Sequence, residues 1–113
     1  MPKEPKIYLE DIIEAIERIE TYTDGIEYQE FLGDRLIQDG VERNLITIGE
    51  AVSQLPDEVK RKYSEIEWRK ISGLRNIVVH AYSSVDEEIV WDVTENKLAK
   101  LKQQILEILS KMD

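Results

Sequence analysis

The sequence predicts an all-α fold, an antiparallel bundle of four to five helices. Apolar residues recur every three or four positions in the long segments, and the alternation typical of strands is absent. Turn-forming residues such as Thr23-Asp24-Gly25 and Pro56 separate these segments. A length of 113 residues suits one domain over residues 1–113, and the 35% charged fraction suits helices with well-solvated outer faces.

The first helix is expected from Ile7 to Tyr22, after a frayed segment over residues 1–6. Thr23-Asp24-Gly25 is expected to end it, because glycine readily leaves the helical conformation. The apolar residues of its core-facing stripe are Ile12, Ile13, Ile16 and Ile19.

A short helix is expected at Tyr28–Leu32, and a long helix begins at Asp34 and ends before Pro56. The long helix contains Gly40 and Gly49, which cost helix propensity and are expected where another helix approaches closely. Its core-facing stripe consists of Ile37, Val41, Leu45, Ile48, Val52 and Leu55.

The remaining helices are expected at Asp57–Lys62, from Trp68 to about Val79, and at Glu87–Lys111, the last interrupted near Thr94–Asn96. Ser84 and Glu87 have the spacing of a capping box at the start of the last helix. Its stripe consists of Leu98, Leu101, Ile105, Ile108 and Met112.

The composition excludes several kinds of site. The chain has no cysteine and one histidine, so disulfides, thiolate metal sites and multi-histidine metal sites within one chain are excluded. No apolar run approaches the roughly 20 residues of a membrane span, and the start does not resemble a secretory signal, so a cytoplasmic protein is expected. The net charge of −9 argues against a broad, non-specific nucleic-acid binder, but it permits a small basic cleft.

The segment from Gly73 to Tyr82 contains the residues best suited to chemistry. Arg75 lies five positions before His80, the single histidine, and Tyr82 lies two positions after it. This places a permanent cation, a group that can titrate near neutral pH and a phenol within two turns of backbone. Such groups suit chemistry on a phosphate ester, although the spacing alone is a weak signal.

Four blocks around this segment carry a family resemblance. They are Phe31–Asp34 with Gln38–Leu45, then Ile48–Val52, then Trp68–Asn76 running into His80-Ala81-Tyr82, and finally Val90–Val93. With them the chain resembles the HepT-like branch of the HEPN domain proteins, small helical ribonuclease toxins of prokaryotic toxin–antitoxin pairs.

The resemblance implies a homodimer whose two Arg-His motifs meet in one cleft and cleave RNA, messenger or transfer, without a metal or other cofactor. It also implies an antitoxin partner, a nucleotidyltransferase that uses ATP and magnesium to transfer AMP onto Tyr82.

The residues suggest how such a site would work. His80 can act as a general acid or base, Arg75 can bind phosphate oxygens, and Asn76 can orient the imidazole four positions along the helix. One histidine per chain is too few for separate acid and base roles, and a two-fold dimer supplies two. Five residues at about 100° each put Arg75 and His80 roughly 140° apart around one helix, which also favours a site completed by a second subunit.

Simpler interpretations stay open for each residue. His80 could be a satisfied structural histidine, Arg75 a surface cation paired with an acidic side chain, Asn76 a capping residue and Tyr82 a core aromatic. At the level of function, the chain could be a non-catalytic helical module that dimerises and binds a nucleotidyltransferase partner. It could also be a plain helical adaptor whose motif has no chemistry.

Overall fold

All regular secondary structure in the described part of the chain is helical. The computed structural model describes residues 4–79 and 86–112 and contains no strand there. The predicted all-α class is therefore confirmed. Its helices are α1 (Pro5–Thr23), α2 (Tyr28–Leu32), α3 (Arg35–Gln54), α4 (Asp57–Lys62), α5 (Trp68–Ser72), α6 (Leu74–Val79), α7 (Glu87–Asn96) and α8 (Leu98–Ser110).

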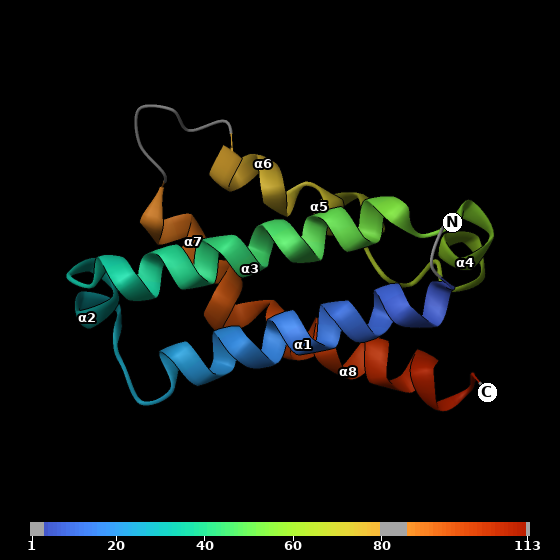
Figure 1. Cartoon of the computed structure of the whole chain (residues 1–113), viewed down its shortest axis with the longest axis horizontal. Helices are drawn as coiled ribbons and strands as arrows, with labels where there is room; N and C mark the ends of the chain where they lie inside the picture. Colours follow the sequence, from blue (N-terminus) through green and yellow to red (C-terminus); the bar gives the residue numbers. More distant parts are fainter. Residues whose placement is uncertain (1–3, 80–85, 113) are drawn as a thin grey trace.

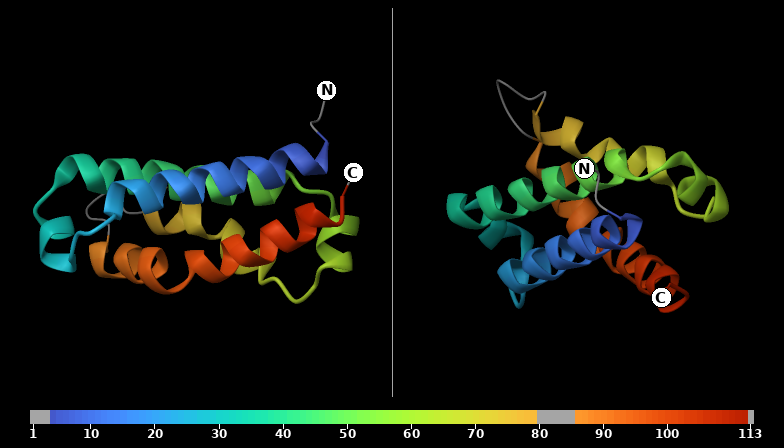
Figure 2. Two further views of the ribbon diagram at one scale, coloured as in Figure 1. Left: turned by 90° about the horizontal axis from the view of Figure 1, so that it is seen from below. Right: turned by 45° about the vertical axis from the view of Figure 1, so that its right-hand side comes forward.

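Two long antiparallel helices form the centre of the bundle. Helix α3 lies between α1 on one side and α5 and α6 on the other, and α8 packs along α1 (Figure 1). Helices α7 and α8 follow one another along the remaining side and close the bundle (Figure 2). No helix among the described residues is long and apolar enough to cross a membrane.

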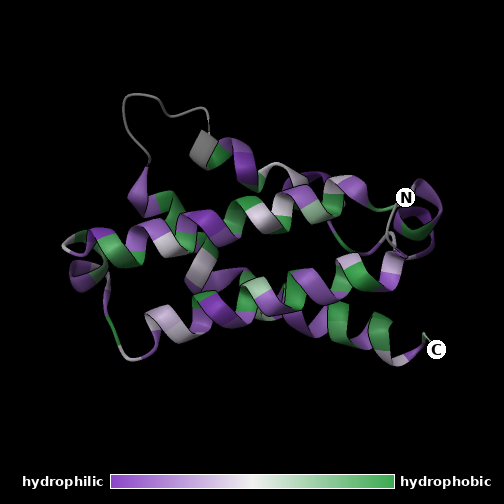
Figure 3. Ribbon diagram, in the orientation of Figure 1, coloured by the Kyte–Doolittle hydropathy of each residue, from purple (hydrophilic) through white to green (hydrophobic). Residues whose placement is uncertain are grey.

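The core forms where the predicted apolar stripes meet. Helix α1 contributes Ile12, Ile16 and Ile19, each 0% exposed, whereas the charged residues between them are exposed. Hydrophobic and hydrophilic residues accordingly alternate along the ribbon of each long helix (Figure 3). The other predicted stripe residues are buried as well, except Ile37 and Met112, which are partly buried at the edge of the core. The buried members from the long helices are Val41, Leu45, Ile48, Val52, Leu98, Leu101, Ile105 and Ile108.

Local chemistry explains most helix ends. Asp34 precedes α3, and its side chain accepts a hydrogen bond from the backbone N–H of Ile37 at 3.1 Å, as an N-cap does. Helix α1 ends at Thr23, and Gly25 adopts φ of 74°, a conformation that glycine takes without strain. At its other end α1 begins at Pro5, earlier than the sequence predicts, because proline suits the first turn of a helix.

The expected continuous helix from Trp68 to Val79 is wrong. Helix α5 ends at Ser72, Gly73 forms a turn, and α6 begins at Leu74. The backbone N–H of Asn76 donates to the carbonyl of Gly73 at 2.9 Å, a bond one residue shorter than that of an α-helix. Glycine has low helix propensity, and the regular helix is interrupted at this residue, just before α6 and Arg75.

The last helical region differs in two details. The break falls at Lys97, one residue after the expected Thr94–Asn96 interruption. At the start of α7 the N-cap is Asp86, whose side chain accepts hydrogen bonds from the backbone N–H groups of Glu88 and Ile89. Ser84, the expected cap, lies outside the described residues.

Candidate functional site

Helix α6 carries Arg75 and Asn76, and it is held close to the backbone of α3. Both side chains are exposed. A Cβ atom added at Gly49 of α3 would lie 3.0 Å from the carbonyl oxygen of Ser72 and 3.1 Å from the backbone nitrogen of Arg75. Any side chain at position 49 would therefore push the start of α6 away. The expectation that Gly49 permits close helix contact is confirmed, and this contact fixes the backbone of Arg75.

A buried tryptophan anchors the segment that leads into α6. Trp68 is 7% exposed, and its indole Nε1 donates hydrogen bonds to the carbonyl oxygens of Lys60 at 3.1 Å and Tyr63 at 3.0 Å. These bonds join the start of α5 to the end of α4. Leu74, 7% exposed, then packs α6 onto the core. Trp68 is therefore a packing residue, and it supports the segment that carries Arg75.

A pair of carboxyl groups lies between α3 and the start of α7. Burial raises the pKa of Glu42 to about 7, and a hydrogen bond with Glu87 and the charges of Glu87 and Asp39 act in the same direction, whereas Arg35 lowers it. The second oxygen of Glu87, Oε2, is buried and has no hydrogen-bond partner among the described residues. The raised pKa favours the protonated form of Glu42 beside Glu87, at the point where α7 begins next to α3.

This pair of carboxyl groups is not predictable from the sequence pattern. Residues 42 and 49 are seven positions apart, which places Glu42 and Gly49 on the same side of α3, roughly 10 Å apart along its axis. Glu42 thus faces the side of α3 on which α6 packs. Residues 42 and 87 are too far apart in the sequence for any helical periodicity to connect them, so only the tertiary structure reveals the contact.

Aromatic packing also holds α7 one turn beyond Glu87, on the same face of the helix. The ring of Trp91 lies 5.1 Å from that of Phe31 and 6.0 Å from that of Tyr28, measured between centroids. Trp91 is thus a packing residue that joins α7 to α2.

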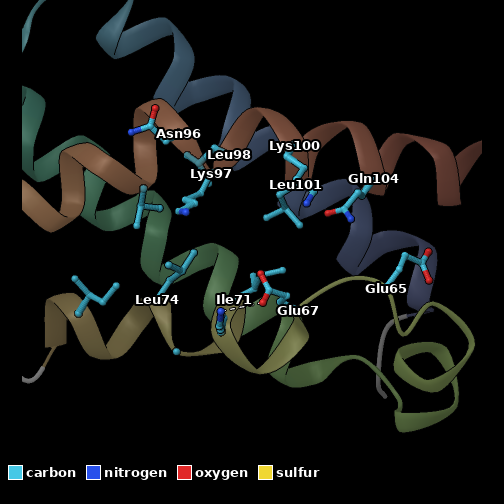
Figure 4. Close-up of a pocket in the computed structure, with 14 residues that line it drawn as sticks. Glu65, Glu67, Ile71, Leu74, Asn96, Lys97, Leu98, Lys100, Leu101 and Gln104 are labelled. Carbon is cyan, nitrogen blue, oxygen red and sulfur yellow. Dashed lines mark ion pairs between the residues drawn. The ribbon is translucent and has the colours of Figure 1, made fainter.

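A groove of about 790 Å³ runs between α5 and α6 on one side and α7 and α8 on the other (Figure 4). Arg75 and Asn76 do not line it, but their neighbours on α6 do. Its lining residues are Glu65, Glu67, Lys70, Ile71, Gly73, Leu74, Ile77, Val93, Asn96, Lys97, Leu98, Lys100, Leu101 and Gln104.

Comparison with known proteins gives the family. The model of the family described as "Ribonuclease HepT-like" matches residues 12–108, which includes all four motif blocks. The chain belongs to the ribonuclease HepT-like family. The family predicted from the motif blocks is therefore confirmed.

Relatives of this HepT-like chain with ribonuclease names agree with this family assignment. It is 41% identical to the "Probable ribonuclease HepT" of Thermococcus cleftensis over 90% of this chain and 93% of the relative. It is 35% identical to a "Putative RNase" of Caldanaerobacter subterraneus over 96% of this chain and 97% of the relative.

A longer relative contains a region similar to the whole chain. This "Gamma-glutamylcyclotransferase and putative RNase" of Methanocaldococcus jannaschii is 39% identical over 100% of this chain, which spans 51% of that relative's length. No solved structure matches.

Of the four predicted site residues in this HepT-like chain, the structure describes two. Arg75 and Asn76 lie side by side on α6, exposed. Within the described ranges, no ion pair joins Arg75 to an acidic side chain, so the interpretation of Arg75 as a paired surface cation gains no support. His80 and Tyr82 lie outside the described residues. The distance from Arg75 to His80, the orientation of His80 by Asn76 and the role of Tyr82 therefore stay predictions.

Proposed function

We propose that this chain is an endoribonuclease toxin that cleaves cellular RNA, messenger or transfer, without a metal ion. The observation that carries the proposal is the exposed guanidinium of Arg75 on a helix whose backbone is fixed against Gly49. In a chain with 24 acidic and 15 basic residues, an arginine without an ion pair among the described residues is available to bind a phosphate. Membership in the ribonuclease HepT-like family supports this reaction class.

The reaction is a transesterification within the RNA. His80 of one subunit takes the proton of the 2′-hydroxyl, and the 2′-oxygen attacks the neighbouring phosphorus. The bond from phosphorus to the 5′-oxygen breaks, and that oxygen takes a proton from an acid, the partner subunit's His80. Arg75 donates N–H bonds to the non-bridging oxygens, whose negative charge increases in the transition state. The products are a 2′,3′-cyclic phosphate and a 5′-hydroxyl.

A homodimer supplies what one chain lacks. One histidine cannot donate and accept a proton in the same step, and residues 75 and 80 point roughly 140° apart if they continue one helix. A two-fold axis beside α6 would place two copies of the motif in one cleft.

Regulation follows from the same cleft. A nucleotidyltransferase antitoxin with ATP and magnesium would transfer AMP to Tyr82, with attack of the phenol oxygen on the α-phosphorus and departure of pyrophosphate. The bound AMP adds bulk and negative charge where RNA binds, and its phosphate can pair with Arg75. Mass spectrometry of the chain co-expressed with such a partner should show AMP on Tyr82. An unmodified Tyr82 in a silenced complex would contradict this step.

The proposal is tested by incubating purified, unmodified protein with mixed cellular RNA in EDTA. Arg75→Ala and His80→Ala should each abolish cleavage, because each removes a group that acts on the reacting phosphate. Arg18→Ala is the matched control, since Arg18 is an exposed arginine on α1, away from α6. If the wild type is folded, dimeric and as inert as His80→Ala, the non-catalytic interaction module replaces the ribonuclease.

A further inference from the structure

The groove between α5–α6 and α7–α8 has an apolar floor. Aliphatic side chains point into it from both sides, Ile71 and Leu74 from α5 and α6 and Leu101 from α8 (Figure 4). Its volume of about 790 Å³ is within the range of sites that bind ligands. Leu74 and Leu101 are buried at the base of the groove, whereas Ile71 and Ile77 are only partly buried and offer apolar surface that a partner would cover.

The residues at the edges of the groove carry a small excess of positive charge, whereas the chain as a whole has a net negative charge. Three lysines and two glutamates line it, whereas the whole chain has 15 basic and 24 acidic residues. Lys97 and Lys100 lie on one side and make no ion pair within the part of the chain that the structure describes. Across from them Lys70 pairs with Glu67 at 2.9 Å.

The groove already stabilises one carboxylate. The hydrogen bond and charge of Lys70 lower the pKa of Glu67, and the more distant charges of Lys100 and Lys97 act in the same direction. The lysines at this edge of the groove therefore favour a negatively charged group. Lys97 and Lys100 can pair with carboxylates of a partner.

The shape of the groove suits a short helix. Its α7–α8 side runs from Val93 to Gln104, which is roughly 16 Å at the rise of an α-helix, or about three turns. RNA fits the lining less well, because the described residues that line the groove include no aromatic residue and no arginine to stack on bases. An aliphatic floor with lysines along its edge matches a helix that has one apolar face and acidic flanks.

We propose that this groove docks an acidic amphipathic helix of a partner protein. Leu74 and Ile77 of α6 line the groove, and Arg75 and Asn76 lie between them in the sequence. A docked helix would thus contact the element that carries Arg75, on a surface that Arg75 does not line. The proposal does not depend on ribonuclease activity, because binding is measured directly.

The test is a selection from a displayed library of helical peptides about 14 residues long. Each peptide has leucines spaced three and four apart. All remaining positions are varied between glutamate and lysine. A chain with a net charge of −9 attracts lysine-rich peptides to most of its surface, so non-specific binding enriches lysine. The proposed docking enriches glutamate instead.

The matched protein variants are Lys97→Glu with Lys100→Glu, and Lys62→Glu with Lys111→Glu. Both pairs change the net charge equally, but Lys62 and Lys111 do not line the groove. A selected acidic peptide should lose about tenfold or more in affinity for the first pair and keep its affinity for the second. In NMR spectra of the wild type, it should shift the methyl signals of Ile71, Leu74 and Leu101.

Three results would overturn the proposal: no enrichment, enrichment of lysine, or shifts confined to residues outside the groove. A short oligouridylate that shifts the same methyl signals more strongly than the acidic peptide would assign the groove to RNA instead. Folding of each variant is checked by the dispersion of its amide spectrum.

Discussion

Replacing glycine by alanine at two positions of α3 separates helix propensity from helix contact. Gly49→Ala and Gly40→Ala each gain about 1 kcal/mol of helix propensity, because both residues lie inside the same helix. At position 49 the new methyl would lie 3.0 Å and 3.1 Å from backbone atoms of Ser72 and Arg75, which cannot move without moving α6. At position 40 it would meet the ring of Tyr22 at 3.0 Å, but that side chain is 40% exposed and can turn away.

The two variants should therefore differ in sign. Overpacking against backbone costs about 1–3 kcal/mol, so Gly49→Ala should lower the free energy of unfolding by up to about 2 kcal/mol. Gly40→Ala should leave the free energy of unfolding unchanged or raise it by up to about 1 kcal/mol. Urea unfolding followed by circular dichroism, at one fixed protein concentration, measures both. If Gly49→Ala were as stable as Gly40→Ala, close contact with α6 would not be what requires glycine at position 49.

Three further predictions concern single contacts, each measured by urea unfolding. Because the pKa of Glu42 is raised from 4.5 to about 7, this group makes the fold less stable as pH rises through that range. Glu42→Gln should therefore raise the free energy of unfolding by about 1–2 kcal/mol at pH 8, after allowance for solvent near Glu42, and change it little at pH 4. Glu50→Gln is the exposed control on α3, and an equal gain at both pH values would refute the raised pKa of Glu42. Trp68→Phe removes the donor to two carbonyl groups and should cost about 1–3 kcal/mol; a cost below the error of measurement would show that the indole bonds do not hold α5. Asp86→Ala should cost about 1 kcal/mol and Asp86→Asn much less, since asparagine also caps; equal costs would remove the capping role.

Helical periodicity was enough to predict most of the fold. The stripes from Ile12 to Ile19 and from Val41 to Leu55 are buried as expected, because a helix that buries one face must repeat apolar residues along it. Asp34 and Pro56 were found as helix boundaries because their own chemistry sets a boundary. The turn at Gly73 was missed, since an isolated glycine inside an apolar pattern is compatible with a continuous helix.

The candidate site was only partly predictable. The contact at Gly49 was predicted because an unfavourable residue within a helix is visible in the sequence, whereas the role of Arg75 stays a prediction from the motif. The pair of Glu42 and Glu87 was not predicted, because each looks like an ordinary exposed acid until tertiary packing brings them together. The groove was missed for the same reason, since its two sides come from segments that no local pattern connects.

Attack by the RNA's own 2′-hydroxyl distinguishes the proposed mechanism from hydrolysis by water. Two RNAs would be compared that differ only by a 2′-O-methyl group at the nucleotide where wild-type protein cuts, in EDTA, with the ends of the products identified by mass spectrometry. Attack by the 2′-hydroxyl predicts a 2′,3′-cyclic phosphate from the unmodified RNA and no cleavage of the methylated one. Equal cleavage of both RNAs, with 5′-phosphate and 3′-hydroxyl ends, would contradict the mechanism built on Arg75 and His80.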